Sequence, residues 1–383
     1  MNFSLTEEQA MWRRAVHQFA AGVLRPRAAE LDEQAAFPSD ALPTMAGLGL
    51  LGLNVPQAFG GAGVDPIGAA IAIEELGWAC GGTALSVAAH NGLACEPIAH
   101  FGSQQQQERW LPGLAAGEQG LAALALTEPG AGSDLAGGVT TRAEQDGDQW
   151  RINGQKAWIT NASLAPLIVT LCRTEPAAGS GALSLIVVPT GSDGLTIHPK
   201  EKKLGTRASP THSVTYEDVR VPADHLLGEP GQGLYQTLQV LDGGRIGIGA
   251  LAVGLAQAAL EHAIDYARQR HAFGVRLADH QAIRFMLADA AAQIESARLM
   301  VYRAAWLKGQ GQPFSQAASM AKLLATEMAE KVCRDAIQVH GGYGYSAEFP
   351  VERLYRDARL MTIGEGTSEM QRMVIAKRLL DGD

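Results

Sequence analysis

The stretch 234–270 decides how the chain folds, and it reads LYQTLQVLDGGRIGIGALAVGLAQAALEHAIDYARQR. It contains no proline and keeps the apolar spacing that is typical of one long amphipathic helix. Similar proline-free stretches cover 280–307, 315–339 and 369–380, and the sequence GQGQP at 309–313 makes a clear break. Helices of this length with short breaks predict an antiparallel four-helix bundle over residues 228–383.

The composition changes twice outside that bundle. Residues 1–118 are rich in Ala and Leu, with helical periodicity over 5–31, and predict an N-terminal helical domain. Residues 119–227 carry short apolar runs, which predict a small β-domain, and Asn153-Gly154 predicts a hairpin turn there. We therefore expect an α+β protein with an N-terminal helical domain, a central small β-domain and a C-terminal antiparallel helical bundle.

The overall composition limits the function. The chain has 383 residues, 46% of them hydrophobic, and a formal net charge of −9, which disfavours nucleic acid as the main partner. Four scattered cysteines show no metal-ligand or redox spacing, so we expect reduced thiols, no metal and a cytoplasmic protein. No stretch approaches the roughly 20 apolar residues of a membrane span. Ser4 and Glu7 predict a capping box for the first helix.

Gly364-Glu365-Gly366 places a carboxylate between two glycines, and a helix-start signal follows at 367–369. Gln371 lies three residues after Ser368, in a capping-box arrangement. Glycine takes no side-chain space, so the backbone can come close to a flat ligand. The pattern indicates a candidate catalytic base, although most glutamates beside glycine are solvated turn residues.

A second candidate site is the loop 126–134 (LTEPGAGSD), which combines a proline turn, two glycines and hydroxyls at both ends. Such a loop can offer backbone N–H groups and hydroxyl donors to an electron-rich ring or a thioester. The sequence WITN at 158–161 adds an aromatic plane and another hydroxyl. The structural alternatives are a tight surface turn and, for Trp158, an ordinary core residue.

Thr127–Asp134, Trp158–Asn161 and Ile363–Arg372 together make the chain resemble the acyl-CoA dehydrogenase family of flavoproteins. The resemblance covers essentially the whole chain. Further motifs that carry it are FGG at 59–61, DVRVP at 218–222, DGGR at 242–245, RQRHAFG at 268–274, HQAI at 280–283, QVHGGYGY at 338–345 and PVER at 350–353. Their joint presence, in order and at matching spacing, argues against coincidence.

The resemblance implies an FAD cofactor and contacts for it. Thr127 and Thr160 would hydrogen-bond the flavin ring, with Trp158 packed against it. The implied cofactor-binding residues are Leu126, Thr127, Ser133, Trp158, Ile159, Thr160, Arg270, Phe273, Gln281, Gln338, Val339, Gly341, Gly342, Thr367 and Ser368. Arg270, Phe273 and Gln281 would hold the pyrophosphate and adenine side, and an arginine suits a pyrophosphate through bidentate charge-assisted hydrogen bonds.

The resemblance also implies an assembly, because residues 338–342 would receive FAD across a subunit boundary. In this family FAD lies between protomers, usually in a homotetramer, so a homo-oligomer is expected. The implied reaction is α,β-dehydrogenation of an acyl-CoA thioester, with an electron-transfer flavoprotein as the partner that receives the electrons. A base removes the α-proton while the β-hydrogen leaves as hydride to flavin N5.

Glu365 matches the base of the short- and medium-chain type of the family. Some other members carry the base just before an arginine that matches Arg245, and this chain has Gly244 there. Glu365 is therefore the candidate at either family position. The residues implied to lie near the substrate are Ser133, Asp242, Arg245 and Gly366.

Gly364 departs from the family, which commonly has tyrosine just before the base. Removing that ring opens space near the acyl α- and β-carbons, so one hypothesis is a bulkier, branched, cyclic or carrier-bound acyl group. The alternative is that another side chain fills the gap. Rival functions on the same fold are an acyl-CoA oxidase and an acyl-carrier-protein dehydrogenase. A DNA-associated relative would need a basic C-terminal region, and residues 228–383 hold 17 basic and 17 acidic side chains.

Overall fold

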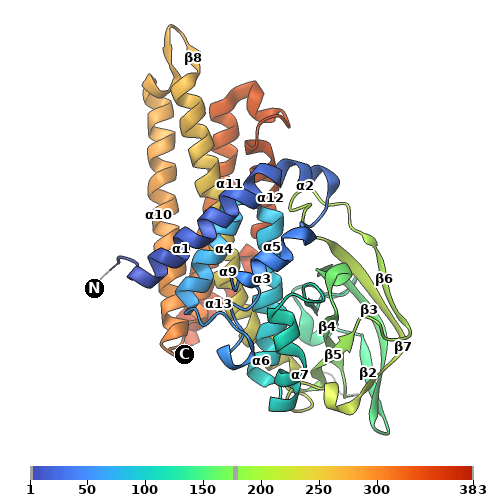
Figure 1. Ribbon diagram of the computed structural model, residues 1–383. Coiled ribbons are helices and arrows are strands. Elements are labelled where there is room, and N and C mark those ends of the chain that lie inside the picture. The colour runs from blue at the N-terminus through green and yellow to red at the C-terminus, as the bar shows by residue number, and fades with distance from the viewer. Residues whose placement is uncertain (1–2, 176–179, 382–383) are drawn as a thin grey trace.

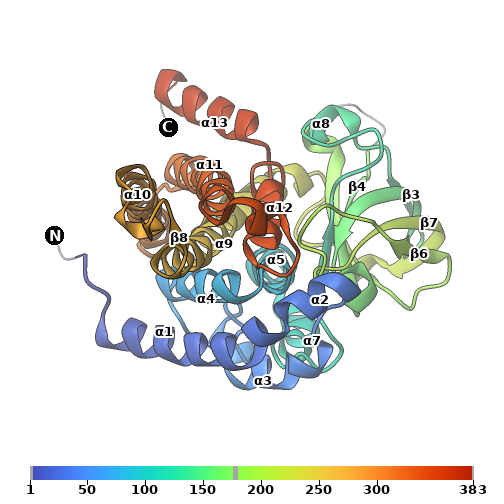
Figure 2. The ribbon, with the colours of Figure 1, turned by 90° about the horizontal axis from the view of Figure 1, so that it is seen from above.

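The computed structural model describes residues 3–175 and 180–381 of the chain. Figure 1 shows an N-terminal helical region, a central curled sheet and long C-terminal helices. Seen from above in Figure 2, the sheet lies to one side of the helices. This architecture confirms the α+β class that was predicted from the sequence.

The N-terminal region is helical, as expected. Its helices are α1 (Glu7–Phe19), α2 (Ala28–Gln34), α3 (Leu42–Gly47), α4 (Pro66–Ala79), α5 (Gly81–Ala89), α6 (Glu96–Phe101) and α7 (Gln104–Ala115). The periodic stretch 5–31 is divided between α1 and α2 by irregular turns over 20–27, where Pro26 has no N–H to donate. The capping box of α1 is formed by Thr6 and Gln9, so the prediction of Ser4 and Glu7 was wrong by two residues.

The central sheet contains seven strands in the described residues. They are β1 (Ala123–Ala125), β2 (Arg142–Asp146), β3 (Gln149–Thr160), β4 (Leu167–Arg173), β5 (Leu183–Pro189), β6 (Leu195–Lys200) and β7 (Thr211–Pro222), with the short helix α8 (Leu135–Gly138) after β1. The strand order is β1-β4-β2-β3-β7-β6, and β5 pairs with β4. β1 and β3 matter for function, because the loops at their ends carry the candidate flavin contacts.

The predicted hairpin turn at Asn153-Gly154 is wrong. β3 runs through this dipeptide, and the chain turns instead at Gly147-Asp148, between β2 and β3. The Asn153 amide donates to Asp218 Oδ1 at 2.9 Å and accepts from the Asp218 N–H at 2.8 Å. Gly154 has φ 152° and lies so close to Thr141 that an added Cβ would be 2.5 Å from its Oγ1. The dipeptide thus forms a bulge where β3 and β7 change register.

The C-terminal region is built on long antiparallel helices. They are α9 (Gly233–Gln269), α10 (Gln281–Gly309) and α11 (Ser315–His340), followed by α12 (Val351–Met361) and α13 (Ser368–Asp381). Two short strands, β8 (His271–Ala272) and β9 (Val275–Arg276), form a hairpin between α9 and α10. α11 packs against both α9 and α10, and so does α4 from the N-terminal region, whereas α13 packs against α11.

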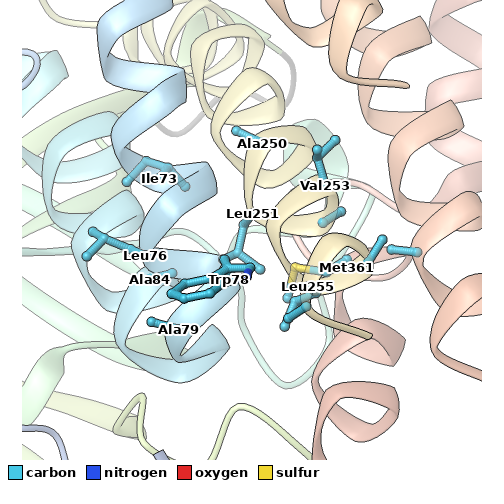
Figure 3. Close-up of a cluster of buried hydrophobic side chains, with 14 of the residues drawn as sticks. Ile73, Leu76, Trp78, Ala79, Ala84, Ala250, Leu251, Val253, Leu255 and Met361 are labelled. Atoms are coloured by element: carbon cyan, nitrogen blue, oxygen red, sulfur yellow. The ribbon is translucent and has the colours of Figure 1, made fainter. Parts of the chain in front are cut away.

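The main core lies where α4 and α5 meet α9 (Figure 3). Ile73, Leu76 and Leu251 are buried there, with Leu251 pointing from α9 toward α4. α9 and α4 can approach closely because Gly254 of α9 faces the backbone of α4. A Cβ added at Gly254 would lie 2.1 Å from the Glu74 carbonyl oxygen. This contact fixes α9 against the N-terminal region, and α9 in turn positions the candidate site.

α9 is long and apolar enough to cross a membrane by length and composition, contrary to the expectation that no stretch would qualify. However, 78% of its most apolar window is buried inside the protein. A core helix passes the same test, and the contacts of α9 with α4, α10 and α11 give it that position.

Candidate active site

The loop with Glu365 joins α12 to α13. Glu365 has φ 54°, in the left-handed region that non-glycine residues seldom adopt, and Gly366 follows with φ 94°. Two successive positive φ values reverse the chain within the loop, which explains the need for glycine at 366. The helix start at 368 is confirmed, but its cap differs from the prediction: Thr367 Oγ1 accepts from the Met370 N–H, and Gln371 Nε2 donates to the Gly366 carbonyl at 2.9 Å.

The Glu365 carboxylate points at α9. An added Cβ on Gly244 would lie only 2.1 Å from Glu365 Oε2, so a larger residue at 244 would force this carboxylate to move. The residue as a whole is partly exposed, but Oε2 is buried and has no hydrogen-bond partner among the described residues. The family resemblance places the base at position 244 or at position 365. These two positions lie side by side in the fold, and the carboxylate there is that of Glu365.

Charged side chains from three helices surround this carboxylate. Burial raises the pKa of Glu365 to about 7, while Lys322 of α11 and Arg245 of α9 oppose the rise and Glu96 of α6 adds to it. Arg245 is itself buried, and its guanidinium donates to Asp242 and to Ser319. A carboxyl group that has a pKa near neutrality and an oxygen without a hydrogen-bond donor has the properties of a general base.

A cavity of about 310 Å³ is lined by α4, α9 and the segment 53–56. Gly243 and Gly244 form part of its wall, and Lys308 lies at its edge. The Lys308 ammonium bonds Glu96 Oε1 at 2.5 Å, and Asn54 donates to Glu96 Oε2 at 2.6 Å. Glu96 is thus compensated within the protein, which leaves Glu365 as the carboxylate with a free oxygen beside Gly244.

The loop 126–134 is held by a buried ion pair. Lys156 of β3 donates to Glu128 Oε1 and to the Leu126 carbonyl, both at 2.9 Å. Glu128 also accepts from Thr140 and Thr141. Burial alone would raise the pKa of Glu128, but Lys156 and these donors hold it at about 2. The Glu128–Lys156 ion pair was not predicted from the sequence, because nothing in the sequence pattern around a lysine in a strand shows that its side chain is buried.

Further predicted flavin contacts lie at the end of β3, next to the loop 126–134. Trp158 has φ 62° and is 60% exposed, so its ring stands on the surface rather than in the core. Thr160 is half-buried, and the Thr127 carbonyl accepts from the Ala157 N–H, which joins the loop to the strand. The Ile159 side chain is buried in the sheet core, so only its backbone could reach a cofactor. Ser133 is exposed at the loop's tip.

The remaining predicted contacts form a second group near β8 and the end of α11. An open hollow of about 570 Å³ is lined by residues that include Arg270, Gln338, Val339, Gly341 and Gly342. Phe273 and Gln281 are exposed nearby, Phe273 to 97%. Both glycines have open space where a side chain would be, and Arg270 is exposed, so the hollow suits a flat, anionic group.

The two groups lie at opposite ends of the long helices, as Figure 1 shows for β8 and α13. Gly244 contacts Glu365, and Gln269 ends the same helix just before Arg270. The 25 intervening residue steps span about 38 Å at 1.5 Å per residue. Within one protomer, Arg270 therefore lies far from Glu365.

The residues present fit a flavin dinucleotide. Ser368 Oγ is buried without a partner at the base of the Glu365 loop, where a ligand could bond it. The first group offers hydroxyls and an exposed indole, and the second an exposed guanidinium beside open glycines. Among residues 3–175 and 180–381, no three His, Cys, Asp or Glu side chains are placed to hold a metal ion, and the four cysteines are buried and free.

Curated proteins that resemble this chain are acyl-CoA dehydrogenases. A probable acyl-CoA dehydrogenase of Bacillus subtilis is 50% identical over 381 residues, 99% of this chain and 100% of the relative. The mitochondrial short-chain specific acyl-CoA dehydrogenase of Rattus norvegicus is 46% identical, over 98% of this chain and 91% of the relative.

Solved structures extend the comparison. Butyryl-CoA dehydrogenase from Megasphaera elsdenii superposes with a TM-score of 0.96 at 38% identity, covering 99% of this chain and 100% of the other. A chain from a study of the electron transferring flavoprotein of Acidaminococcus fermentans gives 0.97 at 38%, over 99% and 100%. A glutaryl-CoA dehydrogenase from Mycobacterium smegmatis in complex with FADH2 gives 0.93 at 31%, over 98% and 95%.

Family models match the chain in three consecutive parts. The N-terminal domain of acyl-CoA dehydrogenase matches residues 6–118, the middle domain 123–219 and the C-terminal domain 231–380. The matches cover nearly all of the chain and follow the order that the sequence motifs implied. The chain therefore belongs to the FAD-dependent acyl-CoA dehydrogenase family.

Proposed function

We propose that the protein converts an acyl-CoA thioester to the trans-2-enoyl-CoA, with Glu365 as the base that removes the α-proton. FAD, when bound, supplies the acceptor for the β-hydrogen, which leaves as hydride to flavin N5. The relatives named for short-chain and butyryl-CoA substrates support an acyl-CoA thioester as the substrate class.

The observation that carries the proposal is the state of Glu365. Its Oε2 is buried and unpartnered, it touches Gly244, and its pKa is raised to about 7 by burial. At neutral pH a large fraction of such a carboxyl is ionised and able to accept a proton, and a general base of this kind typically contributes about 10²–10⁴-fold to the rate.

Neighbouring groups would orient the substrate. The Glu365 backbone N–H would donate to the thioester carbonyl and stabilise the negative charge that develops as the α-proton leaves. The hydroxyl of Ser133 is exposed at the tip of its loop and available to a substrate. Buried Arg245 donates a hydrogen bond to Asp242, and burial raises the pKa of Asp242 although Arg245 opposes this.

Thr127, Thr160 and Trp158 would hold the flavin ring, and Arg270 with residues 338–342 of a second protomer would hold the pyrophosphate. The distance between the two groups along α9 supports a homo-oligomer, in keeping with the tetramer implied by the family resemblance. We also propose an electron-transfer flavoprotein as the electron acceptor, in line with the structural relative from the electron transferring flavoprotein study. Turnover with such a flavoprotein should exceed turnover with oxygen.

The test is the variant Glu365→Gln, assayed on an acyl-CoA panel. We expect a loss of kcat of at least about 10²-fold with bound flavin unchanged, because the amide cannot accept the proton. Glu348→Gln makes the same change at an exposed glutamate and is the control. Retained dehydrogenation by a flavin-loaded Glu365→Gln protein would refute the assignment of the base.

A further inference from the structure

Lys322 on α11 is buried without a carboxylate bonded to it. Its side chain is fully excluded from solvent, and it is among the largest such side chains in the protein. The ammonium donates to the Gly366 carbonyl at 2.5 Å, and Gln371 donates to the same oxygen at 2.9 Å. A buried lysine is costly unless its charge is compensated, so its position calls for an explanation.

The carbonyl that Lys322 binds belongs to the residue just after Glu365. Glu365 adopts a left-handed backbone conformation that is unfavourable for an L-residue. Such conformations persist only where the surroundings enforce them. The two donors on the Gly366 carbonyl hold the peptide between Gly366 and Thr367, one residue beyond Glu365, and so restrain the loop backbone that aims the carboxylate at Gly244.

The charge of Lys322 also acts on the carboxylate. Lys322 is the largest influence opposing the rise in the pKa of Glu365, ahead of Arg245, whereas Glu96 acts in the other direction. Burial lowers the pKa of Lys322 to about 8, with Glu365 and Glu369 opposing and Arg245 adding to the shift. Within residues 3–175 and 180–381, no hydrogen bond or ion pair joins the ammonium to the carboxylate.

We propose that Lys322 is a positioning residue for the base: its ammonium fixes the backbone of the Glu365 loop and places a positive charge beside the carboxylate without occupying either carboxylate oxygen. A direct ion pair would hold the oxygen that must accept the proton. Bonding the charge to the neighbouring peptide avoids this conflict. The inference rests on the proposed role of Glu365 as the base.

Three variants separate the charge from the hydrogen bond. Lys322→Gln can keep a donor near Gly366 but removes the charge, and Lys322→Met removes both. Gln371→Leu removes the second donor to the same carbonyl and leaves the charge in place. Lys331→Met, at a partly exposed lysine of the same helix paired with Asp335, is the matched control.

The readout is the pH dependence of kcat/KM, which reports the base of the free enzyme. Without the positive charge the neutral form of the Glu365 carboxyl is favoured. Both Lys322 variants should therefore shift the midpoint of the kcat/KM–pH curve upward by about one pH unit, which makes kcat/KM about 10-fold lower on the acid side. Lys322→Met should also lower the plateau. Gln371→Leu should lower the plateau of kcat/KM at high pH and leave the midpoint of the curve unchanged. Lys331→Met should give the wild-type curve.

A second readout needs no turnover. Infrared difference spectra of the flavin-loaded wild type against Glu365→Gln follow the protonated carboxyl of Glu365 directly, and its titration should move upward in Lys322→Gln. A folded, flavin-loaded Lys322 variant with the wild-type titration would overturn the proposal. If neither Lys322 variant folds, Lys322 serves the fold and the proposal also fails. The proposed function is judged separately, by wild-type and Glu365→Gln turnover.

Discussion

At the scale of single residues, Gly364 is the position just before the proposed base. The three atoms nearest to a Cβ added there all belong to Leu360, at ordinary contact distances of 3.7–4.0 Å, and Gly364 has no positive φ that would require glycine. The backbone therefore accepts a side chain at 364. The hypothesis that the acyl group uses the space of the missing ring can be tested by restoring the ring.

Gly364→Tyr should therefore narrow the choice of substrate. The ring would take the space of a branched or cyclic acyl group, so we expect kcat/KM for such acyl-CoAs to fall by about 10-fold or more, while kcat/KM for butyryl-CoA changes less. Gly364→Ala, which adds only a tolerated Cβ, should keep the wild-type ratio between substrates. A wild type that prefers straight short chains would contradict the hypothesis.

At the scale of elements, β3 performs two tasks. It crosses the sheet, and its last residues carry Trp158 and Thr160 to the candidate flavin site. The buried Lys156 on the same strand holds the loop 126–134 through Glu128 and the Leu126 carbonyl. The register of β3 therefore sets the positions of both parts of the first group, the end of β3 and the loop 126–134.

Lys156→Met should consequently destabilise the protein and loosen its flavin. It leaves the Glu128 carboxylate buried without its counter-charge, a change that typically costs about 3–5 kcal/mol. Urea unfolding at fixed protein concentration measures the loss, and flavin absorbance of the purified protein measures retention. Arg151→Met, on the same strand as Lys156, breaks an exposed pair with Glu144 of β2 and should leave the free energy of unfolding nearly unchanged. Equal losses for both variants would count against the role of Lys156.

The same elements show how far sequence reasoning reaches. The long helices were predicted to within a few residues, because their apolar periodicity is local. Asn153-Gly154 was misread, because its conformation depends on Asp218, which lies 65 residues away in sequence. Glu365 was found from its motif, whereas Lys322 was missed, because its burial against the Glu365 loop depends on how α11 packs.

At the scale of the whole molecule, about 38 Å of α9 separate Gly244, beside Glu365, from Gln269, the residue before Arg270, so the proposed flavin site takes its Arg270 from a second protomer. Variants in different protomers should then complement each other. Homo-oligomers of Glu365→Gln lack the base, and those of Arg270→Ala should lose flavin. In a mixed oligomer one site combines Glu365 of one protomer with Arg270 of the other, and random pairing should restore roughly a quarter of wild-type activity.

The experiment co-expresses the two variants with different tags and isolates the oligomers that carry both. Tandem purification shows that the two variants assemble. Flavin absorbance measures the bound FAD, and acyl-CoA turnover measures the activity of the same sample. The matched control combines Glu365→Gln with Ser368→Ala, which both change the group of contacts around the base and so leave no intact site in a mixed oligomer. A mixed Glu365→Gln and Arg270→Ala oligomer without activity would show that Arg270 and Glu365 serve the same protomer's site, or that Arg270 does not contact the cofactor.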